Sequence, residues 1–203
     1  MTVGSLDLHT LVLTLIPIFV AIEPFSNVTN FIALTQGFTK KQRSNVARVS
    51  IITASLAVTA FLFVGKGIFV TLGISVPDFL VAGGILLLIV AILLMLGFER
   101  IGHWPKEEVG VVPLGTPLIA GPAVLTTMLI LLDTHGVVPT ILSFLLNMVL
   151  MWWMLAKAER IVQKLGVGGT RALSRIMGLL LAAIAVMMMR RGIVEIVQVT
   201  MNR

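Results

Sequence analysis

The chain has 203 residues, of which 58% are hydrophobic and only 12% are charged. Soluble domains carry about 25% charged residues, so this composition indicates a membrane protein, and the length leaves room for a single transmembrane domain, 1–203. Cysteine is absent, which excludes disulfide bonds and thiolate-ligated metals.

Six apolar windows, each bounded by charged or turn residues, follow one another along the chain. An apolar helix needs about 20 residues to cross a bilayer, and the windows are 8–35, 46–65, 79–98, 109–132, 136–156 and 176–189. The last window is short because it lies between Arg175 and Arg190. It can still cross if these arginines reach back to the interface, or if the helix continues through 192–197. We therefore predict an all-α membrane protein with six transmembrane helices.

The first window contains one acidic residue beside a proline, Glu23-Pro24. No other Asp, Glu, Lys or Arg lies between Asp7 and Lys40. A carboxylate at the centre of a bilayer costs roughly 2.5–3.5 kcal/mol unless it meets a partner, water or a proton. Pro24 removes a backbone donor and disfavours the α conformation at the residue before it. We predict that the helix breaks at Glu23 and that this break is a functional site.

The second half of the chain repeats the first. The aligned pairs are 22–29 with 120–127, Gly73 with Gly166, and Gly84 with Gly178, at offsets of 98, 93 and 94 positions. Because each copy holds three spans, the second copy enters the membrane upside down. Proline-interrupted spans at corresponding places in such a repeat indicate the central site of a secondary transporter. The predicted inverted repeats are 8–98 and 109–197, with discontinuous first and fourth transmembrane helices.

Each predicted break leaves the first amides of a half-helix without partners. Pro24 and Pro122 suit the first position of a helix. Two such positive helix ends near the middle of the membrane would bind an anionic group, most simply a carboxylate. The polar side chains that follow would complete the shell around a small polar solute. The predicted substrate-binding residues are Glu23, Pro24, Phe25, Ser26, Asn27, Thr29, Asn30, Gly121, Pro122, Ala123, Thr126 and Thr127.

Glu23 has two alternative roles at such a site. Ionised, it would pair with a substrate ammonium; protonated, it would couple uptake to the proton gradient. Purely structural roles stay open as well: Glu23 could bond to a neighbouring helix, the prolines could serve packing, and Thr126 and Thr127 could bond to their own helix. For Asn147 we expect a role in joining helices rather than in ligand contact.

The basic residues define an orientation. Of the 15 Lys and Arg residues, 11 fall in the three loops on one side of the six spans. The positive-inside rule assigns this side to the cytoplasm and both termini to the outside, the periplasmic side of a cell membrane. The same distribution accounts for the net charge of +6, so we expect the lipid bilayer, and no nucleic acid, as a partner.

Patterns typical of catalytic or metal sites are absent from the sequence. His9, His103 and His135 are too scattered for a metal triad, and the chain contains neither a His-Glu-x-x-His nor a Gly-x-Ser-x-Gly motif. We therefore expect no enzymatic activity, no cofactor and no metal.

The two breaks and their surroundings resemble the MarC family of bacterial and archaeal inner-membrane proteins, which includes the SnatA neutral amino-acid transporters. The resemblance covers the whole chain and rests on Glu23-Pro24-Phe-Ser-Asn27, on 35–39, on 113–127 and on 175–185. It implies transport of small neutral amino acids such as glycine or alanine, driven by a proton or sodium gradient.

This chain departs from the family motif at two positions. Glu23 and Ser26 stand where the family usually has Asp and Gly, and both larger side chains would shrink a pocket built for small solutes. Two other functions stay open. The first is a channel or exporter of other small solutes, for which the resemblance carries an association with antibiotic resistance. The second is a membrane partner protein that transports nothing.

Overall fold

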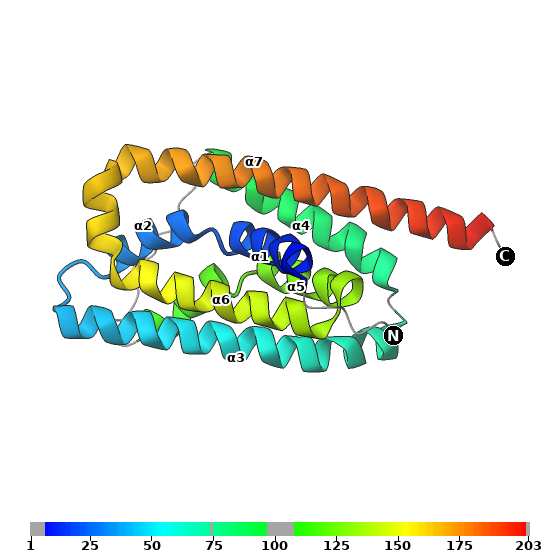
Figure 1. Cartoon of the computed structure of the whole chain (residues 1–203), viewed down its shortest axis with the longest axis horizontal. Helices are drawn as coiled ribbons and strands as arrows, with labels where there is room; N and C mark the ends of the chain where they lie inside the picture. The colour runs from blue at the N-terminus through cyan, green and yellow to red at the C-terminus, as the bar shows by residue number, and fades with distance from the viewer. Residues whose placement is uncertain (1–6, 74, 97–107, 202–203) are drawn as a thin grey trace.

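The computed structural model describes residues 7–73, 75–96 and 108–201, and within these ranges the protein is helical and contains no strand (Figure 1). The elements are α1 (Leu8–Ile22), α2 (Pro24–Leu34), α3 (Lys40–Leu72), α4 (Val76–Leu96), the π-type helix η1 (Gly110–Ile119), α5 (Pro122–His135), α6 (Val137–Ala156) and α7 (Ala158–Met201). The predicted all-α class is confirmed. The end of the third window, His103 and the basic loop around it lie outside the described residues.

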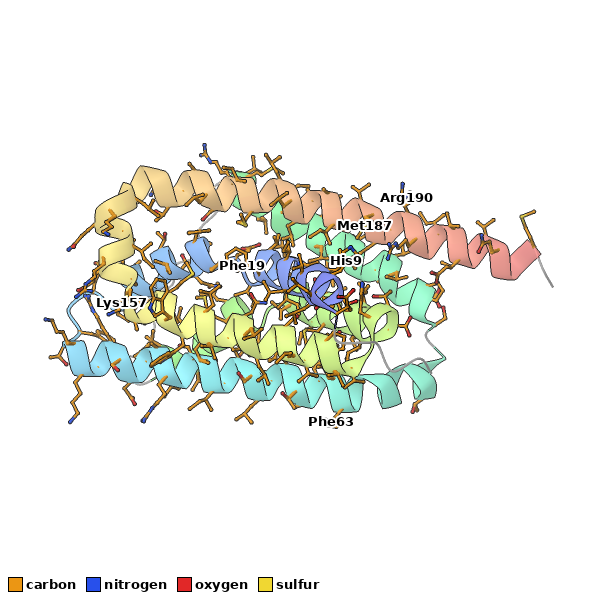
Figure 2. All side chains as sticks on the ribbon, viewed as in Figure 1. His9, Phe19, Phe63, Lys157, Met187 and Arg190 are labelled. Atoms are coloured by element: carbon orange, nitrogen blue, oxygen red, sulfur yellow. The ribbon has the colours of Figure 1, made fainter. Side chains whose placement is uncertain are left out.

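Four helical stretches in the described part of the chain are long and apolar enough to cross a membrane. They are Leu8–Leu34, Lys40–Val64, Val137–Ala156 and Gly168–Gln198. The two remaining windows overlap with the shorter apolar helices Leu80–Leu93 and Ala123–His135. The last long stretch runs through Arg190, an exposed residue labelled in Figure 2, so the helix continues beyond the short window 176–189.

The distribution of side chains is that of a membrane protein. Large apolar residues cover the outside: Phe63 on α3 is 82% exposed, and Val149 on α6 is 64% exposed. Polar residues such as Asn27, Asn30 and Asn147 are instead buried. Water-soluble proteins rarely expose apolar side chains so widely, whereas polar groups of membrane proteins face the interior of the bundle.

The interrupted helices lie in the middle of the bundle. In Figure 1, α3 and α6 run side by side along one edge and α4 and α7 along the other, with α1, α2 and α5 between them. Helices α4 and α7 pack closely, because small residues let their backbones approach. A Cβ atom added to Gly84 would lie 2.8 Å from the carbonyl oxygen of Ala185, and one added to Gly192 would lie 2.7 Å from that of Pro77.

Candidate functional site at two helix breaks

The first break lies at Glu23, as predicted. Helix α1 ends at Ile22, Glu23 adopts the left-handed conformation (φ 54°, ψ 57°), and α2 begins at Pro24. Among the described residues, Glu23 is the only one other than glycine with a positive φ. This conformation costs roughly 1–2 kcal/mol for a residue with a Cβ atom. Backbone strain of this kind clusters at functional sites, where the surrounding structure holds it in place.

The second break lies between η1 and α5, again where the sequence predicts it. The backbone leaves helical geometry at Val112 and Thr116, Gly121 is extended (φ −83°, ψ 172°), and α5 begins at Pro122. Neither α2 nor α5 has a side-chain cap at its N-terminus. Both second half-helices therefore start with a proline and present uncapped backbone amides.

The side chain of Asn27 connects the two breaks. Its Nδ2 donates to the carbonyl oxygen of Ile22 at 2.6 Å and to that of Leu118 at 3.5 Å. Ile22 is the last residue of α1, and Leu118 lies four residues before Pro122. The backbone leaves helical geometry at Ala120 and Gly121, and Pro122 has no N–H to donate. The Leu118 carbonyl is therefore open to the Asn27 side chain.

Buried oxygen atoms without a hydrogen-bond partner gather on the same elements. Within the described part of the chain they are Glu23 Oε1, Asn30 Oδ1, Thr127 Oγ1 and, on α6, Asn147 Oδ1. Buried polar atoms are nearly always paired, so each such atom requires an explanation. Carboxylate and amide oxygens accept hydrogen bonds, and a hydroxyl both donates and accepts. Each of these oxygens therefore has unused capacity to accept a hydrogen bond from an ammonium group or to bind a cation.

The other predicted site residues divide into two groups. Pro24, Gly121 and Ala123 are buried at the starts of α2 and α5, while Ser26 is half-buried; of Pro122 the structure describes only the backbone position. The remaining three already have contacts elsewhere.

Thr29 Oγ1 donates to the carbonyl of Phe25 at 3.1 Å within α2, and the Phe25 ring meets the edge of Phe19 at a centroid distance of 6.4 Å. The methyl group of Thr126 packs on Gly83 of α4, since a Cβ atom at Gly83 would lie 2.1 Å from it. These contacts favour structural roles for Thr29 and Thr126. The own-helix bonding that we considered for Thr126 and Thr127 is seen instead at Thr29.

Two contacts between elements were not predicted from the sequence. Thr14 and Ser143 join α1 to α6 through a hydroxyl–hydroxyl bond of 2.6 Å. The bond from Asn27 to the Leu118 carbonyl was not predicted, because every residue has a main-chain carbonyl and its residue type does not show which one is free. The nearby Pro122, which lacks an N–H, was the only sequence feature that pointed to a free carbonyl in this segment. Asn147 Nδ2 donates to the carbonyl of Leu15 at 3.1 Å, which confirms its predicted role in joining helices.

Residues 8–197 match the family described as "MarC family integral membrane protein". UPF0056 membrane protein MJ1677 of Methanocaldococcus jannaschii is 36% identical over 200 residues, covering 93% of this chain and 98% of that protein. UPF0056 membrane protein PYRAB13050 of Pyrococcus abyssi is 30% identical, covering 92% and 95%. UPF0056 inner membrane protein YhgN of Escherichia coli (strain K12) is 29% identical, covering 84% and 89%.

No solved structure matches the chain. The family match and the archaeal relatives each extend over nearly all of the sequence, and both helix breaks fall inside the matched residues. The chain therefore belongs to the MarC family of integral membrane proteins.

Proposed function

We propose that this protein is a secondary-active transporter of small neutral amino acids, such as glycine or alanine, with its substrate site where the two helix breaks meet. The observation that carries the proposal is the Asn27 side chain, which holds the end of α1 against the carbonyl of Leu118 before the second break. Paired helix interruptions in the interior of a membrane protein are typical of transporter binding sites. The same features favour a carrier over an enzyme.

The chemistry at the breaks suits a zwitterion. The uncapped amides at the starts of α2 and α5 are donors for a substrate carboxylate. The unpaired oxygens of Glu23 and Asn30 are acceptors for a substrate ammonium. A small neutral amino acid carries both groups on one carbon atom, so one molecule satisfies both sets.

The packing of the helices supports two inverted repeats, with α1, α2, α3 and α4 equivalent to η1, α5, α6 and α7. Helix α1 packs on α6, and its equivalent η1 packs on α3; α2 packs on α7, and its equivalent α5 packs on α4. Exchanging the two repeats converts each of these pairs into the other. This reciprocity is expected of a pseudo-two-fold axis, about which the third helices, α4 and α7, also meet.

Glycines at the junctions support the same relation. Among the described residues, the glycines with positive φ are Gly37 (76°), Gly73 (68°), Gly136 (86°) and Gly166 (72°). Gly37 and Gly136 each follow the second half-helix of a repeat, and Gly73 and Gly166 each precede its third span. A positive φ thus recurs at equivalent places in the two repeats. The pair Gly73 and Gly166 is also the pair that the sequence repeat aligns.

Glu23 is our candidate for the coupling residue, binding either a proton or a sodium ion. It stands at the first break, and its Oε1 lacks a partner within the described residues. We place the protein in the inner cell membrane, because the name of the Escherichia coli relative assigns that protein to the inner membrane. The distribution of Lys and Arg supports an orientation with both termini outside.

Uptake of labelled glycine and alanine into proteoliposomes tests the proposal. We expect saturable uptake under an imposed proton or sodium gradient, and about tenfold less in Asn27→Leu, which leaves the Ile22 and Leu118 carbonyls unpaired. Asn45→Leu is the matched control, because Asn45 is exposed on α3 and its side chain accepts a hydrogen bond from Arg48, a neighbour on the same helix.

Three results would contradict the proposal. The first is no uptake of any common neutral amino acid under either gradient. The second is conductance that does not saturate, which would indicate a channel. The third is equal uptake by folded Asn27→Leu and Asn45→Leu, which would place the site elsewhere.

A further inference from the structure

A cavity lies away from the helix breaks, at the end of the bundle where α2 and α6 end and α3 and α7 begin. Its volume is about 330 Å³. Lys157, which lines it, is labelled in Figure 2 at the end of the molecule where these elements meet. None of the residues predicted to bind the transported substrate lines this cavity.

The lining of the cavity carries an excess of positive charge. Its basic residues are Lys40, Arg43, Lys157 and Arg160, and its acidic residue is Glu159. Glu159 pairs with Arg43, whose Nε also donates to the carbonyl of Thr35 at 3.2 Å. Lys40, Lys157 and Arg160 have no ion-pair partner among the described residues. The cavity therefore offers three uncompensated cations to an anionic ligand.

The floor of the same cavity is apolar. Phe31 and Leu155 line it and are 3% and 2% exposed. Trp152, on the outer surface of α6, lines one side and is 49% exposed. Tryptophan at the end of a transmembrane helix marks the headgroup level of the bilayer. Basic side chains beside apolar ones at this level match a phospholipid, in which a negatively charged phosphate is joined through glycerol to apolar acyl chains.

We propose that this cavity binds the headgroup of an anionic phospholipid. The phosphate contacts Lys40, Lys157 and Arg160, and the first carbons of the lipid lie against Phe31 and Leu155. Basic pockets between transmembrane helices on the cytoplasmic side are known to suit such headgroups. A free phosphate ion carries the same charge but has no apolar part to contact Phe31 and Leu155. The lining therefore favours the lipid. The proposal does not depend on the transport function.

Native mass spectrometry of the purified full chain, with phosphatidylglycerol or phosphatidylcholine at equal concentration, tests this site. We expect the wild type to retain phosphatidylglycerol preferentially. The triple variant Lys40→Gln, Lys157→Gln, Arg160→Gln should lose this preference, by about fivefold per charge removed. The triple variant Lys41→Gln, Arg48→Gln, Lys164→Gln is the control: it removes the same charges from exposed residues outside the cavity.

A charge-preserving variant separates lost binding from lost folding. Lys40→Arg, Lys157→Arg, Arg160→Lys should retain the lipid preference of the wild type. Equal loss in the cavity variant and the control variant would overturn the proposal, because it would show that only the overall charge matters. Equal retention of the two lipids by the wild type would also overturn it. So would inorganic phosphate that raises the melting temperature as much as phosphatidylglycerol does, since the site would then bind the free ion.

Discussion

Glu23 combines two unfavourable features at one position. Its backbone is left-handed, a conformation that glycine adopts without strain. Its carboxylate lies in the interior of an apolar segment, and Oε1 has no partner in the described part of the chain. Replacement by glycine would remove both costs, so neither the fold nor the break requires a glutamate here. The carboxylate is therefore best explained by a function.

The backbone strain at Glu23 can be measured separately from its carboxylate. Glu23→Gly and Glu23→Ala both remove the acid, but only alanine keeps a Cβ atom in the left-handed conformation. We expect the free energy of unfolding of the glycine variant to exceed that of the alanine variant by about 1 kcal/mol. Denaturant unfolding in detergent micelles measures the difference. Equal stabilities would show that residue 23 leaves the left-handed conformation in solution.

The carboxylate itself is tested by Glu23→Gln. Glutamine keeps the size of the side chain but cannot take up and release a proton. We expect accumulation of glycine against a gradient to be abolished, while exchange of internal for external glycine continues. The control is Glu195→Gln on α7, an exposed glutamate, which should behave as the wild type. Loss of both accumulation and exchange in folded Glu23→Gln would instead assign Glu23 to direct substrate binding.

At the residue scale, the positions of the two helix breaks could be predicted from the prolines, but the hydrogen bonds to main-chain carbonyls could not. Pro24 follows a lone acidic residue and Pro122 follows a glycine, whereas Pro17 lies in a purely apolar run and is tolerated inside α1. A proline together with its neighbour therefore allowed both breaks to be predicted from the sequence. The partner of the freed Leu118 carbonyl, however, is Asn27, 91 positions away. Only the tertiary arrangement of α2 beside η1 brings the two together. The αL conformation of Glu23 was likewise not predicted, because proline disfavours the α region at the preceding residue without selecting which other region it adopts.

At the level of helices, the ends were harder to predict than the breaks. We expected the second span to end near residue 65, and the apolar stretch long enough to cross a membrane ends at Val64, but helix α3 itself continues to Leu72. Helix α7 runs to Met201 and includes Arg190 and Arg191. Arginine is a good helix former, so a charge ends an apolar window without ending the helix. Gly166, aligned with Gly73 by the sequence repeat, does interrupt α7, at φ 72° and ψ 165°.

The α4–α7 contact gives a prediction at the same scale. A methyl group at Gly84 would lie 2.6 Å from Met189 Cγ and 2.8 Å from the backbone oxygen of Ala185. Because that backbone cannot easily yield, we expect Gly84→Ala to lower the free energy of unfolding by about 1–3 kcal/mol. Gly168→Ala is the control, since no atom lies within 4 Å of its added Cβ and alanine favours the helix. Thermal unfolding in micelles should separate the two variants; equal melting temperatures would contradict the close packing.

At the scale of the whole molecule, one ion pair joins the two proposed repeats. Arg43 at the start of α3 pairs with Glu159 at the start of α7, and it is the only salt bridge within the described residues. Their side chains are 22% and 57% exposed, and ion pairs so open to solvent contribute about 0–1 kcal/mol. The pair is therefore easily broken. If transport requires the repeats to rock against each other, the ends of α3 and α7 must separate at this point in each cycle.

The absence of cysteine from the chain makes this separation testable by cross-linking. In the double variant Arg43→Cys, Glu159→Cys, a bifunctional thiol reagent that forms reducible bonds should join α3 to α7 and abolish glycine uptake, and dithiothreitol should restore it. The control pair Thr39→Cys, Gln42→Cys replaces two residues that contact each other just before and within the first turn of α3. The reagent should join these residues too, without loss of uptake, because both belong to one repeat. Full uptake by the Arg43–Glu159 cross-linked protein would show that transport proceeds without separation of the repeats at this end, and the rocking mechanism would have to be abandoned.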